Sequence, residues 1–99
     1  MQTDARHFER KSTKLDGHVT SAADPSVDVS CEIIDLSAGG AKLKISNAKQ
    51  LNGEISLKIG DLGPYPAEIV WSRPPQMGVK FLASPDVMAE VIMAVALYR

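Results

Sequence analysis

Several features that would assign a protein's class at once are scarce in this sequence. Its 99 residues include one cysteine, two histidines and 5% aromatic residues, and the net charge is only −1. Cys31 has no second cysteine to pair with, so a reducing compartment is expected and the thiol is interpreted as a small buried apolar group. His7 and His18 are too few and too far apart for a metal site. The nearly neutral charge is unlike that of a protein that coats DNA or RNA.

Long hydrophobic runs and catalytic motifs are also lacking. No apolar stretch approaches the roughly 20 residues that a membrane-spanning helix needs, and the N-terminus has no apolar core of the signal-peptide type. There is no nucleophile elbow, no metal-ligand spacing and no phosphate loop of P-loop type. The sequence therefore predicts a cytoplasmic protein of one domain that is not an enzyme, needs no cofactor and does not insert into membranes.

The charge that is present is unevenly distributed. Residues 1–14 carry four basic and two acidic side chains, a net charge of +2 that leaves −3 on the rest of the chain. This segment has no clear strand or helix period, so we interpret it as a flexible basic arm. Arg6 and Arg10 fall on one face of the arm whether it is helical or extended. They form either an anion site or a pair of solvated charges on a loose terminus.

Residues 15–99 alternate between apolar and polar side chains over six short segments separated by turn signals. The predicted strands are 15–21, 27–34, 41–45, 54–59, 65–72 and 77–81, with residues 60–64 as a turn. In the fifth strand, Ala67, Ile69 and Trp71 are expected on one face. The alternation changes parity at Ile33 and Ile34, which predicts a β-bulge.

A helix over residues 85–98 is predicted after the last strand, with Ser84 as its N-cap and Pro85 at its first position. Its predicted apolar stripe consists of Val87, Met88, Val91, Ile92 and Val95. The opposite face, formed by Ala89, Met93, Ala96 and Leu97, is also poor in charge, so it is either core or a homodimer surface. The fold class is therefore mostly all-β: a six-stranded antiparallel β-barrel with a C-terminal α-helix.

A polar turn, residues 35–40 (DLSAGG), separates the second and third strands. It is either a hairpin with local hydrogen bonds or part of a ligand site. Arginine can bind the O6 and N7 edge of guanine or a phosphate, and an ionised Asp35 accepts hydrogen bonds such as those of guanine N1–H and N2–H. With Ser37 as a further donor, the arm and the turn together predict a site for an anionic ligand that contains guanine. Trp71 either stacks on a base or belongs to the core.

Two motifs in this order resemble those of the PilZ domain family. Residues 6–10 (RHFER) match its RxxxR, residues 35–40 match its [D/N]xSxxG, and residues 68–73 (EIVWSR) and 77–82 (MGVKFL) are later similarities. The resemblance implies a barrel of PilZ type that binds cyclic di-GMP. The residues that it implies as the ligand site are Arg6, Arg10, Asp35, Ser37, Gly39 and Gly40, with further contacts from Lys11, Trp71, Arg73 and Gly78. The sequence departs from the family at Ala5, where a further arginine is frequent.

Three functions remain open from the sequence. The first is a cyclic di-GMP receptor that signals to an unidentified effector protein when the ligand orders its arm. The second is a protein-interaction module that acts through helix 85–98 and has a weak or vestigial nucleotide site. The third is a small RNA-binding barrel, which the net charge and the few aromatic residues disfavour.

Overall fold

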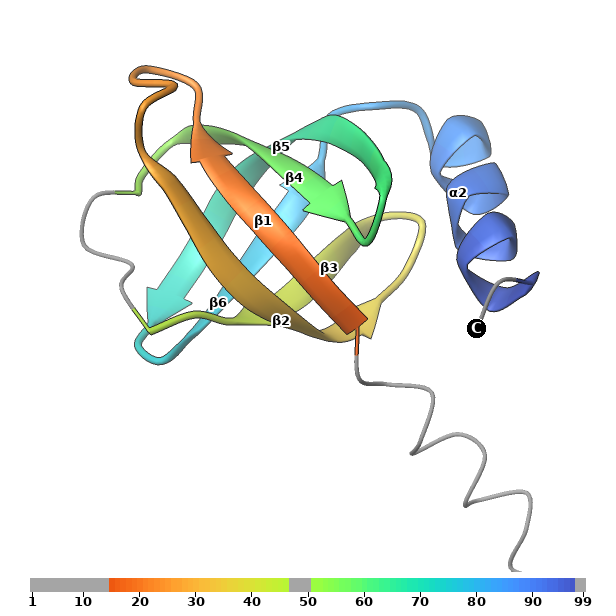
Figure 1. Cartoon of the computed structure of the whole chain (residues 1–99). Helices are drawn as coiled ribbons and strands as arrows, with labels where there is room; N and C mark the ends of the chain where they lie inside the picture. The colour runs from red at the N-terminus through yellow and green to blue at the C-terminus, as the bar shows by residue number, and fades with distance from the viewer. Residues whose placement is uncertain (1–14, 47–50, 98–99) are drawn as a thin grey trace, which may run out of the picture.

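The computed structural model describes residues 15–46 and 51–97. In this part of the chain, six antiparallel strands form a closed barrel with the order β1-β2-β3-β6-β5-β4, and one helix follows them (Figure 1). The strands are β1 (Leu15–Ser21), β2 (Asp28–Leu36), β3 (Gly40–Lys44), β4 (Glu54–Ile59), β5 (Leu62–Arg73) and β6 (Gln76–Phe81), and the helix is α2 (Pro85–Leu97). The predicted fold class is confirmed. Strand β5 begins at Leu62, earlier than expected, because the turn before it occupies only Gly60 and Asp61.

The barrel interior is filled by the apolar residues of the alternating pattern, as the sequence predicts. Their side chains are almost completely buried, and the largest are Ile33, Leu43, Ile45, Ile55, Leu57, Ile59 and Met77. Burying one such side chain contributes about 1.5–3 kcal/mol relative to leaving it in water. The polar residues between them face outward, so the groups that can bind a ligand lie on the outer surface of the barrel.

Besides a register shift between Leu57 and Ile59 in the β4–β5 pairing, two bulges interrupt this alternation. In β2, Ile33 pairs with Leu43 but Asp35 pairs with Lys42, so the bulge predicted at Ile33 and Ile34 is confirmed. In β5, Ile69 pairs with Val79 but Trp71 pairs with Gly78. This second bulge was not expected. It turns Trp71 to the outside, where the residue is 40% exposed. The prediction that Trp71 shares a face with Ala67 and Ile69 is wrong for that reason.

Helix α2 lies at one end of the barrel, beside the β2–β3 turn (Figure 1). Ser84 caps it as predicted: the Val87 N–H donates to Ser84 Oγ at 3.3 Å. Met88 and Val91 are buried, but Val87 is 47% exposed, because neighbouring residues lie about a quarter-turn apart on a helix. The predicted stripe is therefore wrong at Val87, and its predicted last residue, 98, lies outside the described residues. No helix in the described part of the chain is long and apolar enough to cross a membrane.

Candidate functional site

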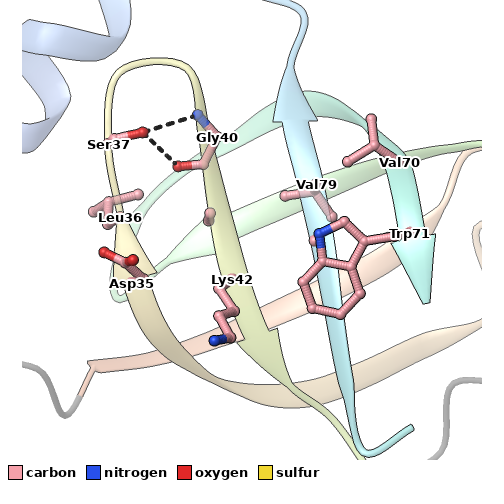
Figure 2. A pocket seen from close by; sticks show the side chains of 10 residues that line it. Asp35, Leu36, Ser37, Gly40, Lys42, Val70, Trp71 and Val79 are labelled. Carbon is pink, nitrogen blue, oxygen red and sulfur yellow. Dashed lines mark hydrogen bonds between the residues drawn. The ribbon is translucent and has the colours of Figure 1, made fainter. Parts of the chain in front are cut away.

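A row of four residues crosses the outside of the barrel, one from each of four neighbouring strands. Asp35 in β2 pairs with Lys42 in β3, Lys42 pairs with Gly78 in β6, and Gly78 pairs with Trp71 in β5. The two bulges lie at the ends of this row and turn Asp35 and Trp71 outward. Paired residues on one face of a sheet have their Cβ atoms about 5 Å apart, so the carboxylate, the ammonium and the indole share one surface (Figure 2).

Trp71 is held over the backbone of Gly78. A Cβ placed on Gly78 would lie 2.5 Å from Trp71 Cε2 and 2.8 Å from Cδ1, so the ring occupies the space that a side chain would take. Gly78 is buried, whereas part of the indole remains exposed. An indole fixed in this way presents a surface on which a nucleobase can stack. Gly78 thus supports the aromatic residue, and its predicted ligand contact stays a prediction.

The turn between β2 and β3 is closed by local hydrogen bonds. The Ser37 N–H donates to Gly40 O at 2.9 Å, and the Gly40 N–H donates to Ser37 O at 3.3 Å. Ser37 Oγ donates to Gly40 O and accepts from the Gly40 N–H, both at 3.3 Å (Figure 2). These bonds support the interpretation of residues 35–40 as a hairpin turn that is stabilised by local hydrogen bonds. The Ser37 hydroxyl is exposed as well, so its predicted ligand role stays a prediction.

The two glycines of the turn differ in what surrounds them. A Cβ on Gly40 would collide with the carbonyl oxygen of Val79, so β3 and β6 approach each other more closely there than any other residue would permit. No atom lies within 4 Å of a Cβ placed on Gly39. Neither residue has a positive φ. Gly40 is therefore required by the packing of the barrel, and Gly39 leaves open space beside the turn.

A shallow hollow of about 250 Å³ lies between the turn and the indole, and all four residues of the row line it together with Ser37 and Gly40. Asp35 and Ser37 lie on one side of it, Trp71 and Val70 on the other, and Lys42 between them (Figure 2). Ligand pockets typically measure about 300–1,000 Å³. A ligand of dinucleotide size would thus extend beyond the hollow and leave surface for other groups to cover.

The basic residues of the predicted site lie in two places. Arg6, Arg10 and Lys11 are outside the described residues. Arg73 is exposed near the end of β5, two residues beyond Trp71. Leu15, the first described residue, pairs with Ile33, two residues before Asp35. The first described residue of β1 therefore pairs with the part of β2 that carries Asp35.

Sequence reasoning missed Lys42 and Val70 as residues of the hollow. Lys42 could have been found, because it lies between two apolar residues of the alternating segment 41–45, which predicts that its side chain faces away from the core. Val70 is 55% exposed as the extra residue of the unexpected bulge, and no local signal indicated it.

Cys31 lies inside the barrel wall and takes no part in this surface. Burial, with a smaller contribution from the nearby Asp16 carboxylate, raises the pKa of its thiol to about 12. The thiol is therefore neutral at physiological pH and is a poor nucleophile. The sequence-based interpretation of Cys31 as a small buried apolar group is confirmed.

Comparisons with known proteins agree with the fold and with the family that the sequence resembles. The model of the PilZ domain family matches residues 4–95. Among solved structures, the PilZ domain of CeSA from a cellulose-synthesizing bacterium is similar, with a TM-score of 0.62 and 25% sequence identity over 87% of this chain and 94% of that one. None of the curated proteins matches. PilZ domains are binding domains known as receptors for cyclic di-GMP. Since the family model spans nearly the whole chain, the protein belongs to the PilZ domain family.

Proposed function

We propose that this protein is a receptor for cyclic di-GMP. The observation that supports it most directly is the row in which two bulges bring Asp35 and Trp71 to one hollow on the outside of the barrel. A guanine stacked on the exposed indole would have its N1–H and N2–H donors available to the Asp35 carboxylate. Stacking and hydrogen bonding would then act on the same base.

Residues 1–14 supply the remaining contacts in this proposal. Arg10 is five residues before Leu15, so its backbone can lie up to about 17 Å from the edge of the barrel, and Arg6 can lie up to about 30 Å away. Both distances are sufficient to bring a guanidinium group to the hollow. The arginines would bind guanine edges and phosphates and fix the segment over the ligand. An unidentified effector protein would recognise the new surface.

Titration of the whole chain with cyclic di-GMP tests this proposal. Trp71 is the only tryptophan, so its fluorescence reports on the hollow alone, and calorimetry gives the affinity and the number of ligands bound. We expect saturable binding accompanied by a change in Trp71 emission. Absence of both signals at about 50 μM ligand would refute the proposal, since even a dissociation constant of about 10 μM would be visible there.

The variant Arg10→Ala separates binding from folding. Loss of one well-placed arginine contact costs about 1–3 kcal/mol, so we expect binding to weaken about 5- to 150-fold with an unchanged melting temperature. Lys58→Ala is the matched control, because Lys58 is an exposed cation on β4 and does not line the hollow. If Arg10→Ala unfolds the barrel, Arg10 is a structural residue instead.

A second function is supported by the exposed face of α2, where Met93 is 65% and Leu97 79% exposed. This face is complementary to itself in an antiparallel dimer centred on Met93, since Leu97 of one copy would face the small Ala89 of the other. Parallel pairing would instead place the two Glu90 carboxylates side by side. The protein would then be an interaction module that pairs with a second copy of the chain.

Mass measurement by size-exclusion chromatography with light scattering distinguishes the two functions. A dimer that forms without nucleotide and is unaffected by Arg6→Ala favours the interaction module. A mass that changes only when cyclic di-GMP is added favours the receptor.

A further inference from the structure

Lys42 occupies the middle of the row and was not among the residues expected to bind ligand. It is half-buried, with Asp35 opposite on one neighbouring strand and Gly78 opposite on the other. Because Gly78 has no side chain, no group separates Lys42 from the indole that lies over β6 (Figure 2). Among the described residues, no carboxylate oxygen lies within 4.0 Å of the Lys42 ammonium. None of the described carboxylates therefore competes with a ligand in the hollow for the N–H donors of Lys42.

Asp35 and Lys42 present an acceptor and a donor side by side. The carboxylate only accepts hydrogen bonds and the ammonium only donates them. Guanine has the matching order along one edge, because its N1–H and N2–H donors are followed by the O6 acceptor. Adenine has the reverse order at the same positions, with an acceptor at N1 and an amino donor at N6.

We infer that Asp35 and Lys42 together select guanine over adenine for the base that stacks on Trp71, with Lys42 donating to O6. This inference rests on the proposed nucleotide site and adds the origin of its base specificity. An adenine in the same place would direct its N1 lone pair at the carboxylate and its N6 amino group at the ammonium. Both hydrogen bonds would be lost. Two acceptors would face each other at Asp35 and two donors at Lys42, in a partly desolvated hollow.

The experiment compares three ligands: cyclic di-GMP, cyclic di-AMP and the mixed cyclic GMP–AMP. Calorimetry is carried out on the whole chain and on the variant Lys42→Met, which keeps the aliphatic stem and removes the donors. We expect the unmodified protein to prefer cyclic di-GMP to cyclic di-AMP. Lys42→Met should weaken binding of cyclic di-GMP about 10- to 100-fold, the range for one good base contact, while binding of cyclic di-AMP stays the same or strengthens.

Lys44→Met is the matched control. Lys44 is on the same strand and undergoes the same change of charge, but it pairs with Glu32 and Gln76 instead of Asp35 and Gly78. The Lys44→Met variant should keep the same preference between the ligands as the unmodified protein. Lys42→Gln, which keeps a donor without the charge, should retain part of the preference for guanine. If circular dichroism shows that Lys42→Met does not fold, the binding of the three ligands by Lys42→Gln tests the inference in its place.

Two results would overturn the inference while leaving the proposed function intact. One is an equal loss of affinity for all three ligands in Lys42→Met, together with a weaker salt dependence, which would mean that Lys42 only neutralises phosphate. The other is equal binding of cyclic di-GMP and cyclic di-AMP by the unmodified protein. If that protein binds none of the three ligands, the proposed function fails and the inference fails with it.

Discussion

At the scale of single residues, three glycines near the hollow should respond differently to the same added methyl group. In Gly78→Ala the Cβ would displace the Trp71 indole, which can swing outward because it is exposed. We expect the fold to survive and the Trp71 emission to shift to longer wavelength as the ring becomes more solvated. Cyclic di-GMP binding should weaken about 5- to 150-fold, because loss of one stacking contact costs about 1–3 kcal/mol. Fluorescence and calorimetry measure these effects.

The other two glycines are controls: an added methyl group should destabilise the fold at Gly40 and have no effect on stability at Gly39. Gly40→Ala brings a Cβ against the Val79 carbonyl oxygen, a backbone atom that cannot move without disturbing β6. It should lower the free energy of unfolding by about 1–3 kcal/mol. Gly39→Ala meets no atom within 4 Å and should leave stability in urea unfolding unchanged. If Gly78→Ala destabilises the fold as much as Gly40→Ala, the indole is a structural group.

Cys31 makes stability depend on pH in the alkaline range. Its thiol has a pKa of about 12 in the folded protein and about 8.5 in the unfolded chain. The unfolded state therefore loses its proton first, so the Cys31 contribution is fully present below about pH 8.5 and is lost as the pH rises toward 12. Between pH 7 and pH 10 this lowers the free energy of unfolding by up to about 2 kcal/mol.

The comparison with Cys31→Ala isolates the contribution of Cys31 from the other effects of alkaline pH on the protein. Urea unfolding at pH 7 and pH 10 should show a smaller alkaline loss of stability for Cys31→Ala than for the unmodified protein. An equal loss in the two proteins would contradict the raised pKa.

At the scale of elements, α2 contains two methionines with opposite environments. Met88 is completely buried, whereas Met93 is 65% exposed. Met88→Ala should lower the free energy of unfolding by about 2–5 kcal/mol, the cost of a cavity in a packed core. Met93→Ala should change it by less than about 0.5 kcal/mol. Chemical unfolding measures both, and similar losses for the two would mean that the outer face of α2 is covered in solution.

The strands show how far a local pattern can be interpreted. The β2 bulge was predictable because Ile33, Ile34 and Leu36 break the alternation within the strand itself. In β5, Ala67, Ile69 and Trp71 keep a regular alternation, so nothing local indicates the bulge. It becomes visible only when β5 is paired with β6, where Ile69 is opposite Val79 and Trp71 is opposite Gly78.

At the scale of the whole molecule, the barrel closes within residues 15–81, since β1 pairs with both β2 and β4. A chain that lacks residues 1–13 should therefore fold with nearly the same melting temperature. Under the proposed function it should lose most of its affinity for cyclic di-GMP, because both motif arginines are removed. Calorimetry and thermal unfolding test these two expectations, and a truncated chain that fails to fold would show that the barrel needs the first residues.

The sequence by itself determined the barrel, its buried residues, the cap of α2 and the two motifs of the family, because each depends on a period or spacing within a few neighbouring residues. Only the tertiary structure decided that Asp35, Lys42, Gly78 and Trp71 form one outward row. The reason is that strand register depends on hydrogen bonds between segments far apart in the chain. A single extra residue in one strand reverses the side on which a side chain lies, and the local sequence of β5 does not record it.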